Sequence, residues 1–222
     1  MADLFDGYLL GQQWDEMFGA VGDPRPAYAG LFASLQPIDG EELAARADLL
    51  SQTYRDAGVT FAHAGEEQPF PLDIVPRVIG AEEWDVIERG VAQRVLALEA
   101  FLADVYGAMQ IVTDRVLPRH VVTTSSHYHR VAFGIQPGNG VRVHVSGIDL
   151  IRDAQGTFRV LEDNLRSPSG VSYVMENRRT MARVFPDLFA SHRVRAVGDY
   201  ASHLLRALRA SRDHTPTKRG DR

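Results

Sequence analysis

The chain has 222 residues, a length that fits one large domain or two small ones. Its hydrophobic share of 45% and charged share of 24% are those of an ordinary globular protein, and it contains no cysteine. Disulfides, thiolate metal sites and cysteine nucleophiles are therefore excluded. The start of the chain lacks the basic region of a secretory signal, and the longest apolar stretch is too short for a membrane span. We therefore expect a cytoplasmic protein with no membrane partner.

The net charge of −5 is unevenly distributed along the chain. Residues 1–177 carry a net charge of −12, whereas residues 178–222 carry +7. A basic end can bind nucleic acid. This one lacks the interleaved aromatic residues that stack on bases. We therefore expect a solvated helix followed by a frayed basic tail, and no nucleic-acid partner.

Residues 1–38 are expected to form an irregular arm with one brief helix, because prolines interrupt its short apolar clusters. A helix is predicted after this arm. Asp39 and Glu42 form a capping-box-like start, with an acceptor side chain at the N-cap and a glutamate three residues later. Apolar residues then recur at helical spacing as far as Tyr54, and Gly58 provides a stop.

The middle of the chain is predicted to hold one long helix. A short strand over 59–63 and a proline-bounded extended piece over 70–76 precede it. Apolar residues then step by three or four from Trp84 to Val105, and Gly107 ends the pattern. We expect this helix to cover one face of the sheet that follows.

From Val121 the apolar period changes to two, which predicts strands. Valines alternate with polar residues over 141–145, which is typical of a half-buried strand. A turn over 153–156 and a returning strand over 157–164 complete a hairpin.

Helices are predicted after the hairpin. Ser169 is a candidate N-cap for a helix that reaches Phe185, and a last helix is predicted over about 196–210. The chain is thus divided into an N-terminal arm, a main portion, a C-terminal helix and a disordered basic tail, which are residues 1–38, 39–190, 191–210 and 211–222.

Three oxygen-bearing side chains of the hairpin are candidates for one site. Glu162 and Asn164 share a face, because side chains alternate along a strand. The face of Asp149 depends on the turn. A two-residue loop, at 154–155 or at 155–156, puts Asp149 on the same face as Glu162 and Asn164. A three-residue loop puts it on the other face and removes the site.

Two carboxylates and an amide oxygen suit a hard divalent cation such as Mg²⁺. Asp149 and Glu162 on an otherwise apolar face repel each other unless a cation balances them. Arg152 or Arg166 could supply that balance instead. Ordinary turn chemistry is the structural alternative for these residues.

The predicted helix start at Ser169 adds a second feature. The first N–H groups of a helix have no partner within the helix and favour an anion. Together with Arg166 and the carboxylates, they are the parts of a phosphate-binding site. The alternative for Ser167–Gly170 is an ordinary turn into a helix.

Several runs of the sequence match a known pattern, and together they cover about residues 10–190. The chain resembles the circularly permuted ATP-grasp family, whose ATP-grasp region is similar to that of glutathionylspermidine synthases. The matching runs are Gly147–Asp153, Val160–Tyr173, Glu176–Arg178, Trp14–Phe18, Pro24–Pro26, Pro69–Arg77 and Phe185–Phe189.

This resemblance implies an ATP-dependent carboxylate–amine ligase, in which ATP phosphorylates a carboxylate and an amine attacks the acyl phosphate. It implies ATP and Mg²⁺ as cofactors, with metal ligands at Asp149, Glu162 and Asn164. Arg166 is the expected catalytic contact to phosphate, and Ser169 is a further expected nucleotide contact. Two weaker candidates, for which we expect a structural role, are Arg77 and His144.

The similarity fades after Phe189, and the only lysine of the chain is Lys218 in the predicted tail. From the predicted helices and the predicted hairpin, we expect an α+β fold with N-terminal helices, a largely antiparallel or mixed sheet and covering helices. It corresponds to the N-terminal portion of a permuted ATP-grasp fold. We expect the lone chain to be catalytically incomplete, as either a truncated gene product or one half of a split enzyme that a second polypeptide completes.

Two other functions stay open. The chain could be a non-catalytic interaction module on the same scaffold. It could also be a hydrolase that uses Asp149 and Glu162 as an acid–base pair, although this leaves Asn164 without a role.

Overall fold

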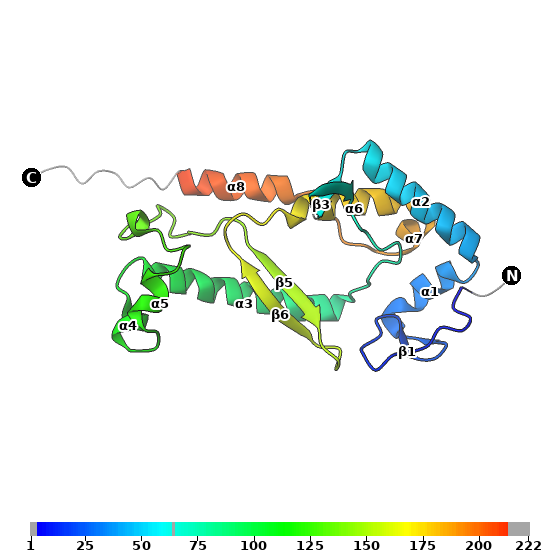
Figure 1. Ribbon diagram of the computed structural model, residues 1–222, viewed down its shortest axis with the longest axis horizontal. Coiled ribbons are helices and arrows are strands. Elements are labelled where there is room, and N and C mark those ends of the chain that lie inside the picture. Colours follow the sequence, from blue (N-terminus) through cyan, green and yellow to red (C-terminus); the bar gives the residue numbers. More distant parts are fainter. Residues whose placement is uncertain (1–3, 64, 213–222) are drawn as a thin grey trace, which may run out of the picture. The chain divides into compact units, whose positions relative to one another are not determined.

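The computed structural model describes residues 4–63 and 65–212 (Figure 1). The chain forms two compact units that alternate along the sequence. Unit 1 comprises Met1–Trp84, Leu150–Leu161 and Ser169–Gly198, and unit 2 comprises Asp85–Asp149, Glu162–Pro168 and Asp199–Arg222. In the part of the chain that is described, helices are combined with three two-stranded sheets, which confirms the predicted α+β class.

Unit 1 contains most of the short strands. Its strands are β1 (Phe18–Ala20), β2 (Asp23–Pro24), β3 (Thr60–His63) and β4 (Glu66–Pro69). Its helices are η1 (Pro26–Tyr28), α1 (Ala29–Leu35), α2 (Gly40–Asp56), α6 (Gly170–Val184) and α7 (Pro186–Ser191). Strand β1 pairs antiparallel with β2, and β3 pairs antiparallel with β4.

Unit 2 is built on the long helix α3 (Ala81–Val105), whose first turn belongs to unit 1. Its other helices are α4 (Gln110–Thr113), α5 (Arg119–Thr123), η2 (Arg130–Ala132) and α8 (Tyr200–Arg212). Strands β5 (Gly147–Arg152) and β6 (Phe158–Asn164) pair in one hairpin. The turn end of this hairpin belongs to unit 1 and its open end to unit 2.

Helix α2 starts as its sequence predicts. The Asp39 carboxylate accepts a hydrogen bond of 2.9 Å from the backbone N–H of Glu42, which satisfies one of the free donors of the first turn. The helix ends before Gly58, whose φ of +65° is the left-handed conformation that favours glycine after a helix.

The core of unit 1 lies where α1 and α2 meet α6 and α7. The Tyr54 hydroxyl, from α2, donates a 2.6 Å hydrogen bond to the Asn177 side chain on α6. The buried members of this core are Met17, Phe18, Tyr28, Leu31, Leu35, Ile38, Leu50, Tyr54, Met181, Val184, Phe185 and Leu188. Residues of the N-terminal arm thus pack against residues some 150 positions later, which joins the discontinuous segments of the unit.

In unit 2, the end of α3 organises the segment that follows it. The Asp104 carboxylate accepts hydrogen bonds of 2.7 and 2.9 Å from the backbone N–H groups of Gln110 and Ile111, which caps α4. The Tyr106 ring stacks on Tyr128 with centroids 5.1 Å apart. These contacts fold the helical segment back onto the end of α3.

The predicted strand over 141–145 is wrong. These residues form no strand, and helices α5 and η2 occupy part of the preceding segment. The physical reason is a hydrogen-bond acceptor on helix α3, which the alternation of valines did not reveal. The Glu99 carboxylate accepts hydrogen bonds from the backbone N–H groups of Arg142, at 2.9 Å, and Val143, at 2.6 Å. Their donors are therefore satisfied by a side chain of α3 and not by a neighbouring strand.

The last helix, α8, begins at Tyr200, later than predicted, and continues to Arg212. The rest of the predicted disordered tail, from residue 213 on, lies outside the described residues. The predicted division of the chain into residues 1–38, 39–190, 191–210 and 211–222 remains a prediction. Across the helices of the described ranges, none combines the length and the apolar character that crossing a bilayer requires.

Candidate metal and phosphate site

The three predicted metal ligands all lie toward the open end of the β5–β6 hairpin. Figure 1 shows this hairpin with its two strands labelled. Asp149 belongs to β5, and Glu162 and Asn164 belong to β6, the strand paired with it. All three residues are in unit 2, and all three are exposed. The hairpin therefore brings two carboxylates and one amide onto neighbouring strands.

The turn end of the hairpin has a three-residue loop. The N–H of Gly156 donates to the carbonyl of Asp153, and the N–H of Asp153 donates to the carbonyl of Thr157, each at 2.9 Å. Gly156 has a φ of +81°, the left-handed conformation of the last residue in such a loop. Continued without interruption, this register puts Asp149 on the face opposite to Glu162, the outcome that would remove the site.

The open end of the hairpin has a different register. A Cβ built on Gly147 lies 3.8 Å from the Cβ of Asn164, so these two residues are opposite each other and share a face. The register at the turn would instead oppose Gly147 to Asp163. The two ends thus differ by one residue, which requires an irregularity in β6 between Phe158 and Asn164. The register of the open end, continued by two residues, places Asp149 opposite Glu162.

The candidate ligands differ from their neighbours in having no protein partner. Within residues 4–63 and 65–212, the side chains of Asp149, Glu162 and Asn164 make no hydrogen bond or ion pair. By contrast, Asp163 accepts two hydrogen bonds of 2.6 Å from Arg94. This guanidinium lowers the pKa of the Asp163 carboxyl and fixes its charge. The carboxylates of the hairpin are thus of two kinds, paired and free.

No group of three or more histidine, aspartate or glutamate side chains that could hold a metal gathers in the described part of the chain. The candidate site contains only two carboxylates, and its third donor is the Asn164 amide. This donor set is sparse for Ca²⁺, which takes six to eight oxygens. It fits Mg²⁺, which keeps several waters and takes one or two carboxylates together with phosphate oxygens.

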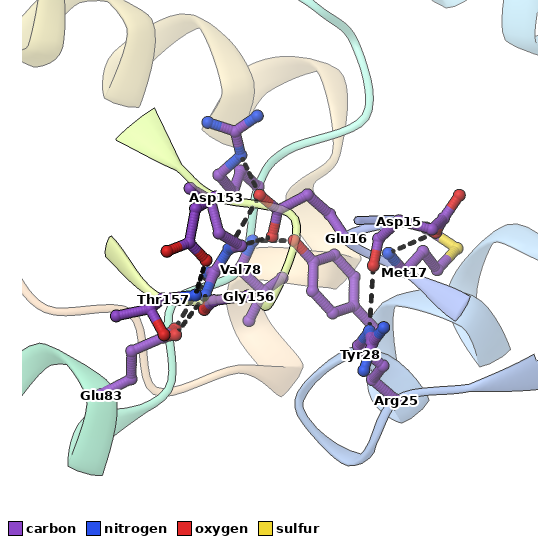
Figure 2. Close-up of polar contacts among 12 residues, drawn as sticks. Asp15, Glu16, Met17, Arg25, Tyr28, Val78, Glu83, Asp153, Gly156 and Thr157 are labelled. Carbon is purple, nitrogen blue, oxygen red and sulfur yellow. Dashed lines mark hydrogen bonds and ion pairs between the residues drawn. The ribbon is translucent and has the colours of Figure 1, made fainter. Parts of the chain in front are cut away.

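Arg152, which could have neutralised the free carboxylates, is committed to other partners in unit 1. Its side chain is only 7% exposed. It donates to both oxygens of Glu83, to Glu16 at 3.0 Å, and to the carbonyl of Gly156 at 2.8 Å. Figure 2 labels these three partners, Glu83, Glu16 and Gly156. These two carboxylates raise the pKa of the Arg152 guanidinium. We call Arg152, Glu16, Glu83 and Trp14 the arginine cluster.

The indole of Trp14 completes the arginine cluster. It packs against the loop at Gly156, where any Cβ would overlap the ring, and Arg25 stacks over it with its guanidinium carbon 3.6 Å from the ring centroid. The Arg152 guanidinium also lies 4.0 Å from the centroid of Phe158. The loop of the hairpin is therefore held by residues of the N-terminal arm and of the first turn of α3.

Sequence reasoning missed the arginine cluster because its members are far apart in the chain. Glu16, Glu83 and Arg152 are separated by more than 60 residues each, and no spacing rule relates them. The available signals were the runs Trp14–Phe18 and Gly147–Asp153, which resembled the family pattern.

The predicted phosphate contacts are exposed. Arg166 lies in unit 2, and its side chain makes no hydrogen bond or ion pair to the described residues. Ser169 lies in unit 1 and occupies the N-cap position of α6, as predicted. Its hydroxyl does not cap the helix, and its carbonyl accepts from both the N–H and the hydroxyl of Ser172.

The two weaker candidates have partners inside the fold. Arg77 pairs with Glu16 at 3.1 Å, and the Nε2 of His144 lies 2.5 Å from the hydroxyl of Ser211. The structural roles of these two residues remain predictions.

Comparison with known protein families identifies the class of protein. Residues 76–219 match the family described as a circularly permuted ATPgrasp. This match covers more than half of the chain, so the chain belongs to the circularly permuted ATP-grasp family. The membership confirms the resemblance found in the sequence.

Comparison with individual proteins gives relatives over most of the chain. An uncharacterized protein of Mycobacterium tuberculosis is 63% identical over 212 residues, which are 94% of this chain and 38% of that protein. An uncharacterized protein of Synechocystis is 42% identical over 205 residues, which are 90% of this chain and 43% of that protein.

A protein of Frankia casuarinae named as a putative glutamate–cysteine ligase is 40% identical over 177 residues, which are 79% of this chain and 20% of that protein. The chain thus spans less than half the length of these relatives. Comparison with solved structures gives no significant match.

Proposed function

We propose that this chain carries the Mg²⁺-binding half of the active site of an ATP-dependent carboxylate–amine ligase. Two findings support the reaction class. The chain belongs to the circularly permuted ATP-grasp family, and its Frankia casuarinae relative is named as a putative glutamate–cysteine ligase. Such a ligase forms an amide bond, with an acyl phosphate as the activated form of the carboxylate.

The observation that carries the proposal is the contrast among the acidic residues of the hairpin. Asp153 pairs with Arg159 and Asp163 pairs with Arg94. Asp149 and Glu162, close by on the same strands, have no partner in the described ranges. Free carboxylates on adjacent strands repel each other, and a cation removes that repulsion. Their free state is therefore what a metal-ligand role requires.

The residues have distinct proposed roles. Asp149, Glu162 and Asn164 hold Mg²⁺, which when bound neutralises phosphate charge that develops during phosphoryl transfer. Arg166 is free to donate a charge-assisted hydrogen bond to a phosphate or acyl phosphate oxygen. Ser169 and the first N–H groups of α6 lie in unit 1, and they are proposed separately as a nucleotide contact.

The groups that grip the rest of the nucleotide are proposed to come from a second polypeptide. The chain matches 38% of the length of the Mycobacterium tuberculosis relative. The lone chain is then expected to bind Mg²⁺ and nucleotide without completing a turnover.

An interaction module on the same scaffold is the second candidate. Exposed apolar side chains on the hairpin favour it, since Ile151 is 46% exposed and Leu161 is 63% exposed. This role would be indifferent to Mg²⁺ and to the loss of Glu162.

The test is isothermal titration of the purified chain with Mg²⁺ and a non-hydrolysable ATP analogue. The Glu162→Ala variant should lose Mg²⁺-dependent binding. The Arg159→Met variant, which removes an exposed ion pair from the same strand, should bind like the parent chain. Equal titration curves for the parent chain and Glu162→Ala would contradict the proposal and favour the interaction module.

A further inference from the structure

The ion pair between Arg94 and Asp163 lies directly beside the proposed metal ligands. Asp163 stands between Glu162 and Asn164 in β6, and it is half-buried whereas both neighbours are exposed. The Arg94 guanidinium binds it through Nε and Nη2, each 2.6 Å from a different carboxylate oxygen. This two-point geometry fixes the direction of the Asp163 side chain more firmly than a single hydrogen bond would.

The direction of Asp163 determines the direction of its neighbours. Side chains alternate along a strand, so a carboxylate held toward Arg94 turns Glu162 and Asn164 to the other face. A Cβ at position 147 would lie 3.8 Å from the Cβ of Asn164, which independently places Asn164 on the face toward which that Cβ would point. The orientation of Asp163 toward Arg94 therefore agrees with the register that opposes Asp149 to Glu162.

This register needs support because β6 is irregular. The turn end of the hairpin follows a register that differs by one residue from that of the open end. A shift of one residue exchanges the faces of all side chains in the affected stretch. Within the described ranges, the side chains of the candidate ligands make no hydrogen bond or ion pair that could resist such a shift.

The pair also removes a third carboxylate from the site. Without Arg94, Asp163 would be a free negative charge next to Glu162. Arg94 donates to both carboxylate oxygens of Asp163, which holds this carboxylate away from the proposed ligands.

We infer that Arg94 is a positioning residue for the metal site: its ion pair with Asp163 sets the face on which Glu162 and Asn164 meet Asp149. The part of this inference that concerns metal binding rests on the proposed function. Its structural content, the register of β6, is tested separately.

The first test compares two matched variants, each losing one arginine that pairs with an aspartate of the hairpin. Arg94→Met should weaken Mn²⁺ binding, measured by electron paramagnetic resonance, by about tenfold or more, as expected for a residue that orients metal ligands. Arg159→Met should leave it unchanged. The charge-reversed double variant Arg94→Asp with Asp163→Arg should recover most of the affinity. Equal affinities for Arg94→Met and Arg159→Met would overturn the inference.

The second test does not depend on metal. The chain has no cysteine, so engineered pairs report register without background. Disulfide formation should be faster for Asp149→Cys with Glu162→Cys than for Asp149→Cys with Leu161→Cys. Adding Arg94→Met should abolish that preference, and adding Arg159→Met should not.

The outcomes separate the two claims. A preserved cross-linking preference in Arg94→Met overturns the positioning role, whatever the metal result. A parent chain that cross-links as expected but binds no Mn²⁺ contradicts the proposed function and leaves the role of Arg94 in the register supported.

Discussion

The two ends of the β5–β6 hairpin carry the same kinds of charged groups and use them differently. At the turn end, Arg152 is buried and bound to Glu16 and Glu83, and Asp153 is paired with Arg159. At the open end, three polar side chains have no partner in the described part of the chain, and these are Asp149, Glu162 and Asn164.

This difference separates charges that stabilise from charges that are available for chemistry. A buried guanidinium is tolerated only when it is paired, and the arginine cluster satisfies it with two carboxylates and a carbonyl. Free, exposed carboxylates contribute little to folding. They are therefore the groups of the hairpin that a ligand can bind without breaking an existing contact.

The largest expected effect on stability is at Arg152. Arg152→Met leaves Glu16 and Glu83 without their shared partner and removes the contact to Gly156, which should lower the free energy of unfolding by about 3 kcal/mol. Urea denaturation followed by circular dichroism measures this change. A loss below about 1 kcal/mol would show that the arginine cluster does not anchor the hairpin.

A smaller effect is expected at the loop. Gly156→Ala introduces a Cβ that overlaps the Trp14 ring at a residue with a φ of +81°, which should cost about 2 kcal/mol. The same denaturation experiment checks it, and the Trp14 fluorescence should shift as well. Unchanged stability and fluorescence would mean that the indole does not pack on the loop.

A pH effect is expected at the open end. Because Arg94 lowers the pKa of Asp163 from its ordinary value of 3.8, the pair stabilises the fold above that pH. Its contribution is lost as the pH falls through the lowered pKa. Arg94→Met should therefore flatten the decline of stability as the pH falls below 3.8, measured by urea denaturation at a series of acidic pH values. If the stability of the parent chain and of Arg94→Met declined identically with falling pH, an ion pair between Arg94 and Asp163 in the folded state would be excluded.

The smallest effect is expected at Arg159, whose side chain is 64% exposed. Removing its pair with Asp153 by Arg159→Met should change stability by less than about 0.5 kcal/mol. A loss comparable to that of Arg152→Met would show that exposure does not distinguish the two arginines of the turn end, and the comparison of the hairpin ends would need revision.

Sequence reasoning predicted the parts of the molecule that depend on neighbouring residues. The start of α2 at Asp39 and its end near Gly58 follow from local capping, and both were correct. The candidate ligands also came from local spacing, since Glu162 and Asn164 are two residues apart on one strand.

Features that depend on distant residues could not be predicted in the same way. The alternating valines over 141–145 suggested a strand, but the Glu99 carboxylate from α3 takes the backbone donors of that segment. The three-residue loop was one of the alternatives considered, yet the compensating irregularity in β6 has no signature in the sequence. The partners of Arg152 were hidden for the same reason.

The central claim is that the open end of the hairpin binds a divalent metal and the turn end does not. Titration of isotope-labelled protein with Mn²⁺ tests it directly, because the bound ion broadens the nuclear magnetic resonance signals of nearby backbone amides. We predict selective broadening around Asp149, Glu162 and Asn164, with the signals of residues 153–157 retained. Broadening centred on residues 153–157, or none at either end, would contradict the account.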